Sequence, residues 1–342
     1  MTADDRTPDD VPFETVSSSE VTRGERIRAT IDEWILVPAR ILWSDWRARV
    51  GTLIMLLYVL MGTVGVWLVD APQIGEGERL IPPFTDPSYP LGTDSMGNDL
   101  FAQVVHATPP MLEMIVAGAL FTTVMATIVG TFSGYKGGRT DKLLMMFTDI
   151  LLTIPGLPLV IVIAVILEPR EPWVIGIILT LNAWAGLARA IRSQVLTMRE
   201  ESFVEASRLM GLPTRTILVK DIVPGLMPYI LVNFVNSART VVFTSVGLYF
   251  LGILPFTNHN WGVMMNLAYT TGGALYTLRA AHWLLVPMAA IVLLSFGFIL
   301  FAQGTDRLFN PRVRARHENN AGANSSDDAD ENSGKVSTHI QG

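Results

Sequence analysis

Two uncharged apolar stretches, residues 50–69 and 283–302, constrain the fold of this chain more than any other sequence feature. A helix needs about 20 mostly apolar residues to cross the hydrocarbon core of a membrane, and each stretch has that length. The composition agrees, because 50% of the 342 residues are hydrophobic and only 16% are charged. We therefore expect an all-α membrane protein.

Four further apolar stretches bring the number of predicted spans to six. They cover residues 114–135, 143–167, 173–188 and 227–253. The third predicted span along the chain, residues 143–167, contains Asp149 and two prolines, Pro155 and Pro158, which should kink it because each removes a backbone donor. The fifth, residues 227–253, contains Arg239.

The predicted spans divide the chain into three parts. Residues 1–49 form a cytoplasmic segment with apolar residues at helical spacing, which predicts an amphipathic helix on the membrane surface. Residues 50–302 form the six-helix transmembrane domain. Residues 303–342 form a polar, acidic cytoplasmic tail, which we expect to be disordered.

Lysine and arginine are distributed unequally between the two sides of this arrangement. Of the 25 basic residues, 21 lie in the two terminal segments and in the connectors 136–142 and 189–220, whereas three lie in the opposite connectors. Cytoplasmic connectors of membrane proteins are enriched in basic residues. Both termini are therefore predicted to be cytoplasmic, in a multi-pass protein of the plasma membrane.

Several function classes lack their sequence signatures. The chain has no cysteine and its five histidines are scattered, so we expect no disulfide and no metal site. A basic nucleic-acid-binding patch and a GxxxxGKS/T phosphate loop are both absent from the sequence. No nucleophile–base set lies in the spans, so we expect no enzyme. A stand-alone secondary transporter or channel is the alternative, although its ion coupling usually needs more than two isolated charges.

The cytoplasmic connector 189–224 has the pattern of two short helices joined by a turn. Ser202 is a candidate N-cap, with Glu205 three residues later at the spacing of a capping box. Gly211 can adopt the left-handed conformation that ends a helix, and Pro213 prevents that helix from continuing.

The two ends of this connector join it to the neighbouring spans. Arg189 and Arg192 are three residues apart, which places them on one face of the preceding helix. A second short helix should start at Thr214, and Pro224 should open the fifth span. The connector is therefore predicted to be a lever that a partner can use to move two spans together.

Two sets of residues also match a known family in order and spacing. The first set is Glu205, Ala206, Ser207, Gly211, Ile222 and Pro224, and the second is Gly92, Thr93, Asp94, Gly97 and Asp99. The first resembles the EAA loop of ABC-importer permeases, and the second resembles the outer-loop motif of their dipeptide, oligopeptide and nickel branch. Weaker matches extend over most of the chain, from about residue 43 to residue 316.

The resemblance implies a type I ABC importer permease fold and an assembly of several subunits. A second permease subunit would complete the translocation pathway for peptides or a related small solute. Two ATPase subunits would hydrolyse ATP beneath the EAA loop, and an extracellular solute-binding protein would deliver the solute. This chain would bind no cofactor itself.

Five positions depart from the pattern of that branch. Basic residues are usual at the positions of Asn98, Gln103 and Pro109, an arginine at Met146 and an acidic residue at Ser245. These differences do not change the predicted fold. They bear on which solute is transported and on which salt bridges of the family this chain can form.

Asp149, Pro155 and Arg239 are the candidate pathway or gating residues. Asp149 lies near the cytoplasmic end of its span, so it either reaches the headgroups or takes part in coupling or gating. Arg239 lies near the middle of its span, where an unpaired arginine is costly. It therefore either pairs with groups of the second permease or lines the path. Their depths differ too much for the two charges to pair directly.

Overall fold

The computed structural model describes residues 43, 45–75, 77–255 and 260–308. The predicted N-terminal amphipathic helix and the tail from residue 309 onward lie outside these residues. The helical elements, in chain order, are α3 (Trp46–Leu60), a π-helical turn (Met61–Gly65), α4 (Val66–Leu68), α5 (Leu100–Lys136), α6 (Gly138–Thr153), α7 (Gly156–Leu167), α8 (Pro172–Leu179), α9 (Ala183–Met198), α10 (Ser202–Leu209), α11 (Thr214–Ile217), a second π-helical turn (Leu218–Ile222), α12 (Val223–Phe250), α13 (Trp261–Thr270) and α14 (Ala281–Leu308).

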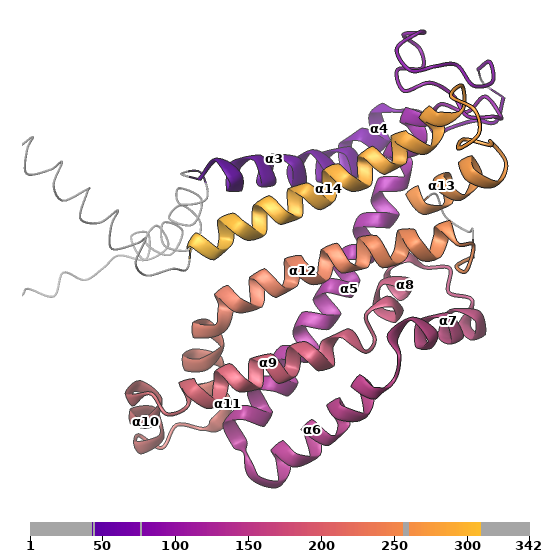
Figure 1. Ribbon diagram of the computed structural model, residues 1–342. Coiled ribbons are helices and arrows are strands. Elements are labelled where there is room, and N and C mark those ends of the chain that lie inside the picture. The colour runs from indigo at the N-terminus through magenta and orange to yellow at the C-terminus, as the bar shows by residue number, and fades with distance from the viewer. Residues whose placement is uncertain (1–42, 44, 76, 256–259, 309–342) are drawn as a thin grey trace, which may run out of the picture.

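The first and last spans, α3 and α14, pack side by side (Figure 1). Small residues allow this, because a Cβ atom added at Gly51 would lie 2.5 Å from the backbone nitrogen of Phe301. One added at Gly304 would lie 2.4 Å from the Cβ of Ala48. In a membrane such small-residue contacts replace the hydrophobic effect as a source of helix association.

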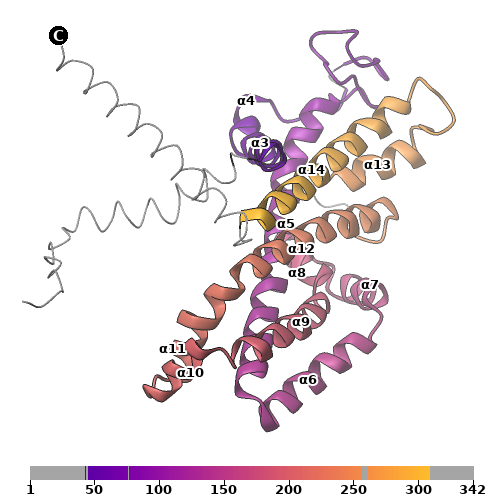
Figure 2. The same cartoon turned by 60° about the vertical axis from the view of Figure 1, so that its left-hand side comes forward.

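The long helix α5 forms the centre of the molecule and packs against α8, α9 and α12 (Figures 1 and 2). Glycines again allow the backbones of neighbouring helices to approach closely. A Cβ at Gly118 would lie 2.6 Å from the carbonyl oxygen of Gly176, and one at Gly130 would lie 2.6 Å from that of Ala188.

The predicted start of the second span at residue 114 was wrong, because α5 begins at Leu100. The Asp99 side chain caps the helix by accepting hydrogen bonds from the backbone N–H groups of Phe101 and Ala102. Polar residues and two prolines, Pro109 and Pro110, interrupt the apolar pattern of this first part of the helix.

The predicted third span consists of two helices, α6 and α7, which meet at an angle of 82°. Ile154 and Pro155 have extended backbone conformations at the break. Pro158 lies in the first turn of α7, where a proline is tolerated, so only Pro155 accounts for the bend. The expected kink is therefore a complete interruption of the helix.

The predicted fourth span is also broken, since α8 and α9 meet at 58°. Its predicted end at residue 188 was wrong, because α9 continues to Met198 and contains Arg189 and Arg192. Within the described residues, four helices are long and apolar enough to cross a membrane alone. Six spans result when each bent pair counts as one.

The fifth span begins earlier than residue 227. Helical structure is continuous from Thr214 to Phe250, through the π-helical turn at Leu218–Ile222. Pro224 is the second residue of α12 and does not start the span. The second short helix of the connector is thus the first part of the span itself.

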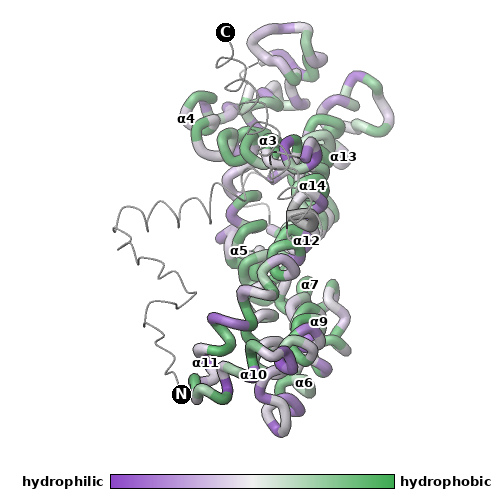
Figure 3. The backbone as a smooth tube through the Cα atoms, turned by 90° about the vertical axis from the view of Figure 1, so that its left-hand side faces the viewer, coloured by the Kyte–Doolittle hydropathy of each residue, from purple (hydrophilic) through white to green (hydrophobic). Residues whose placement is uncertain are grey.

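Different elements lie at the two ends of the long helices. α10 and α11 lie at the same end as the turn from α5 to α6, and the 70–99 loop lies at the opposite end together with α13 (Figures 1 and 2). Hydrophobic residues follow the long helices between these ends (Figure 3).

Candidate functional site

The connector between α9 and α12 forms the short helix α10 as predicted, but its start differs. Glu201 occupies the N-cap position, and no side-chain hydrogen bond caps the helix. Ser202 is already the first helical residue, one position too late to cap it. The predicted capping box was therefore wrong, and the Glu205 side chain is exposed and makes no hydrogen bond to other described residues.

The turn after α10 requires glycine. Gly211 has a φ of +73°, and its N–H donates to the carbonyl oxygen of Arg208 at 2.9 Å. The N–H of Leu212 donates to the carbonyl oxygen of Ser207 at 3.2 Å. These two hydrogen bonds form a Schellman motif, whose glycine avoids the steric cost of positive φ. The predicted left-handed turn is confirmed.

One face of this connector is buried against the spans. Val204 and Ile222 are fully buried and Ser207 is 7% exposed. They belong to or adjoin a core that includes Trp184 and Ile191 of α9. The connector is consequently fixed to both α9 and α12.

The other face is open and partly apolar. Leu209 is 84% exposed and Met210 is 69% exposed, beside the exposed Glu205 and Ala206. Large apolar side chains that gather outside the spans on one surface typically mark an interaction site. We call Glu205, Ala206, Leu209 and Met210 the α10 surface.

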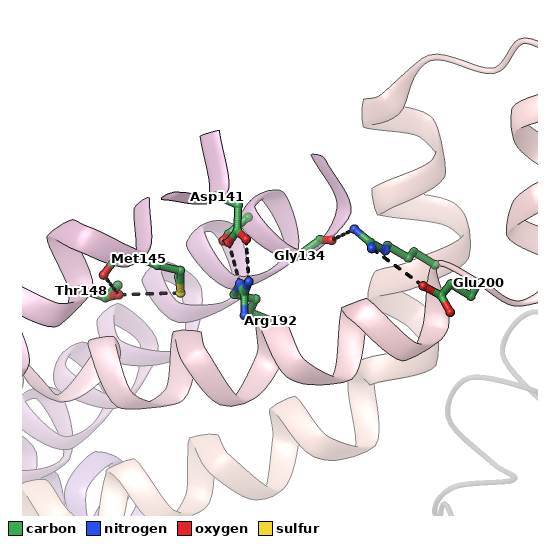
Figure 4. Close-up of polar contacts among 8 residues, drawn as sticks. Gly134, Asp141, Met145, Thr148, Arg192 and Glu200 are labelled. Carbon is green, nitrogen blue, oxygen red and sulfur yellow. Dashed lines mark hydrogen bonds and ion pairs between the residues drawn. The ribbon is translucent and has the colours of Figure 1, made fainter. Parts of the chain in front are cut away.

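Two arginines attach this region to the end of α5. The Arg208 guanidinium lies 4.8 Å from the ring centroid of Tyr135 and donates to its hydroxyl at 3.2 Å. Arg199 donates to the carbonyl oxygen of Gly134 at 3.1 Å (Figure 4). The α10 surface is thus linked to α5 as well as to α9 and α12.

Two ion pairs join α6 to α9. Arg192 donates two hydrogen bonds of 2.5 Å to the two carboxylate oxygens of Asp141 (Figure 4). Arg189 pairs with Asp149, and both of these side chains are about half exposed. The expectation that Asp149 does not pair with Arg239 agrees with this arrangement. The shared face predicted for Arg189 and Arg192 is confirmed, because both contact α6.

Arg239 lies in the middle part of α12 and is partly exposed. It makes no ion pair or hydrogen bond with the residues that the structure describes. The structure therefore does not bring together the three candidate pathway residues, since Pro155 lies at the α6–α7 break and Asp149 contacts α9.

The outer-loop residues form a compact structural unit. The Thr93 hydroxyl accepts a hydrogen bond from the N–H of Ile81 at 2.9 Å and donates one to the carbonyl oxygen of Glu78 at 2.5 Å. Gly92 and Gly97 have φ values of +81° and +82°. A Cβ at either glycine would lie within 2.3 Å of a carbonyl oxygen across the loop.

Asp94 is the central acceptor of this loop and is only 3% exposed. One carboxylate oxygen accepts from the N–H groups of Met96 and Asn98, at 2.7 and 3.0 Å. The other accepts from the side-chain amides of Asn98 and Gln103, at 2.7 and 3.0 Å. Neutral amides thus occupy two of the three positions at which the sequence departs from a basic pattern.

Comparison with known proteins identifies the chain. Residues 126–315 match the family described as the binding-protein-dependent transport system inner membrane component. The chain belongs to this family. It is therefore a multi-pass membrane permease of an ABC importer, with the type I permease fold, and not a stand-alone transporter.

Similar permeases agree over most of their length. The chain is 31% identical to the oligopeptide transport system permease protein OppC of Bacillus subtilis, over 79% of this chain and 87% of that protein. It is 30% identical to the dipeptide transport system permease protein DppC of the same organism, over 83% and 86%. It is 31% identical to the nickel transport system permease protein NikC of Escherichia coli, over 66% and 81%.

Sequence reasoning missed the contacts that hold the permease connector in place. The Arg208–Tyr135 and Arg192–Asp141 pairs join residues 73 and 51 positions apart. No local sequence pattern indicates a contact between residues that lie so far apart along the chain. Nothing in the sequence near Asp141 indicates that Arg192 is its partner.

Proposed function

We propose that this permease forms half of the translocation pathway for peptides or a related small solute, and that the α10 surface receives an ATPase subunit. The observation that carries the proposal is the contrast between the two faces of α10. One face is buried against two spans, whereas the other exposes Leu209 and Met210. A force on the exposed face is transmitted to α9 and α12 through the buried one.

The remaining subunits follow from the same proposal. A second permease completes the pathway, two ATPase subunits bind at the α10 end, and an extracellular binding protein delivers the solute. ATP is hydrolysed by the partners, this chain binds no cofactor or nucleic acid, and the lipid bilayer covers apolar residues such as Ile166, which is 73% exposed.

Gly211→Val tests the docking role. The substitution forces a β-branched residue into positive φ, but a Cβ there meets nothing within 4 Å. The spans should therefore still insert, while the turn and the α10 surface shift. In the purified importer, we expect loss of bound ATPase or loss of solute uptake per ATP hydrolysed.

Gly273→Val is the matched control. Gly273 also has positive φ, +57°, and free space around its Cβ position, but it precedes α14 in the last outer connector. It should retain the ATPase fully. A normal ATPase content and normal coupling in Gly211→Val would refute the docking role.

We also propose that the α10 end is cytoplasmic, together with both termini. This end carries the basic residues Lys136, Arg199 and Arg208, in keeping with the positive-inside rule. Because the chain has no native cysteine, Ser88→Cys in the outer loop should react with an impermeant thiol reagent on intact cells, and Ser325→Cys should not. The opposite labelling pattern would reverse the orientation.

The three candidate pathway residues take separate roles in this proposal. The break at Pro155 lets α6 and α7 move separately, and the Asp149–Arg189 pair holds α6 on α9. Arg239 pairs with a carboxylate outside this chain, on the second permease or the solute. Arg239→Leu should then impair assembly of the importer or solute uptake, whereas Arg239→Lys, which keeps the positive charge, should retain both. Equal uptake by the two variants would exclude this role.

A further inference from the structure

A half-open pocket with both polar and apolar lining residues lies between α5, the α8–α9 break, α9 and α12, within the membrane-spanning region. Its volume is about 330 Å³, at the lower limit for small-molecule sites. The side chains with hydroxyl or amide groups that line it are those of Thr122, Thr180, Tyr229, Asn233, Asn236, Ser237 and Thr240. None of its lining residues carries a charge.

Several hydrogen-bonding groups of this pocket have no partner among the described residues. The Thr122 hydroxyl is buried and unpaired, and this residue is only 2% exposed. The side chains of Asn236 and Ser237 likewise make no hydrogen bond within the described part of the chain. Asn233 donates only one N–H, to the carbonyl oxygen of Tyr229 at 2.8 Å. Of these groups only the Thr122 hydroxyl is buried, whereas the Asn236 side chain is exposed and those of Asn233 and Ser237 are partly exposed, within reach of an occupant. A buried hydroxyl without a partner is costly, so an occupant that supplies this partner is favoured.

The pocket adjoins an interrupted helix. Thr180 follows the last residue of α8, and Ala183 begins α9; both line the pocket. The side-chain amide of Asn182, between them, lies 3.5 Å from the carbonyl oxygen of Ile154 at the α6–α7 break. Interrupted helices in transporters often form solute sites, because their free backbone groups face a cavity instead of lipid.

The chemistry of the lining selects one class of occupant. Divalent metal sites in proteins are usually built with carboxylate, imidazole or thiolate ligands, and the lining supplies none of these groups. The charged side chain nearest in sequence on α12 is Arg239, one turn beyond Asn236, and its positive charge disfavours a cation. A peptide backbone, in contrast, alternates neutral donors and acceptors, as the amides and hydroxyls of the pocket do.

We propose that this pocket is a transit site for the uncharged amide backbone of a short peptide. The assignment rests on the proposed function, and it selects peptides over metal ions among the solutes of the related permeases. Small residues on α9, Gly186 and Ala190, leave room for the peptide beside the polar face of α12.

Substitutions in the assembled importer test the site, with a mixture of alanine di- and tripeptides as the probe. Asn236→Leu and Thr240→Val should each lower peptide uptake per ATP roughly 3- to 10-fold, as expected for one lost hydrogen bond. Thr244→Val makes the same chemical change on α12 outside the pocket lining and should transport normally. Equal uptake by all three variants would overturn the proposal.

Thr122→Val separates the transport role from a structural one. The hydroxyl has no partner in the described residues, so its removal should leave the melting temperature unchanged or raised. The proposal nevertheless expects lower peptide uptake from this variant. Normal uptake with a raised melting temperature would mean that the hydroxyl is only a packing defect.

Cysteine protection identifies the occupant directly. Ser237→Cys should react with a small thiol reagent in the resting complex, and the alanine peptides with ATP should slow this reaction, whereas Ser88→Cys should react equally in both conditions. ATP hydrolysis by the unmodified importer that is stimulated by Ni²⁺ and not by the alanine peptides would overturn the peptide assignment in favour of a cation. A constant lack of reaction, with loss of the second permease on Asn236→Leu, would show that the partner fills the pocket. Absence of any ATP-dependent uptake by the unmodified importer would instead refute the proposed function.

Discussion

The outer loop at residues 77–99 and the α10 surface at the opposite end satisfy their polar groups in different ways. The outer loop is closed on itself, because Asp94 accepts four hydrogen bonds from within the loop and the start of α5. The α10 surface leaves Glu205 without a described partner and exposes Leu209 and Met210. Both regions carry a family motif. The residues of the outer motif hydrogen-bond to one another and stabilise the fold, whereas those of the inner motif leave side chains exposed to which another protein can bind.

This difference separates two kinds of expected effect. Substitutions in the outer motif should lower the stability of the permease, whereas substitutions on the α10 surface should lower its affinity for a partner. Three changes test this distinction, in order of decreasing effect on stability.

Gly97→Ala should have the largest effect. Its Cβ would lie 2.2 Å from the carbonyl oxygen of Gly77, in a backbone with φ of +82°. Strain and overpacking together should cost roughly 3 kcal/mol or more. Thermal unfolding of the purified permease measures this loss.

Gly211→Ala is the control for backbone conformation alone. Its φ is also positive, but no atom lies within 4 Å of the added Cβ, so the cost should be about 1 kcal/mol. If Gly97→Ala and Gly211→Ala lowered the free energy of unfolding equally, the outer loop would have to open at little energetic cost, contrary to its closed arrangement.

Asp94→Ala should have an intermediate effect. It leaves the partly buried amide of Asn98 and the buried amide of Gln103 without their acceptor, which should cost about 2–3 kcal/mol in unfolding measurements. Because these side-chain donors are neutral, the loss should hardly change with salt concentration. Asp86→Ala, which removes one hydrogen bond to the N–H of Ser88, is the control and should cost less than about 1 kcal/mol. A strong salt dependence would indicate that a cation balances Asp94.

Glu205→Ala should have the smallest effect on stability. The side chain is exposed and contacts no described hydrogen-bond partner, so the melting temperature should not change. Retention of the ATPase should fall by a few-fold, as expected for an exposed ion pair worth up to about 1 kcal/mol. Glu200→Ala, outside α10, should retain the ATPase; a drop in melting temperature for Glu205→Ala alone would make this glutamate a structural residue.

The candidate site was predictable wherever its signal was local. The turn at Gly211 depends on a glycine followed by a proline two residues later, and the structure has the expected positive φ there. The prediction of where α10 starts was wrong by one residue. Glu201 and Ser202 are adjacent polar residues, and the sequence does not decide which of them is the last extended residue before the helix. The pocket that Asn236 lines had no local sequence signal, because its polar residues come from α5, the α8–α9 break and α12.

The sequence alone determined the all-helical membrane fold, the apolar stretches and the family, since hydropathy and motif order are properties of the chain itself. The tertiary structure decided the interruption at Pro155, the partner of Asp149 and the closure of the outer loop around Asp94. The physical reason is distance along the chain. Arg189 lies 40 residues from Asp149, and the two meet only because α6 packs against α9.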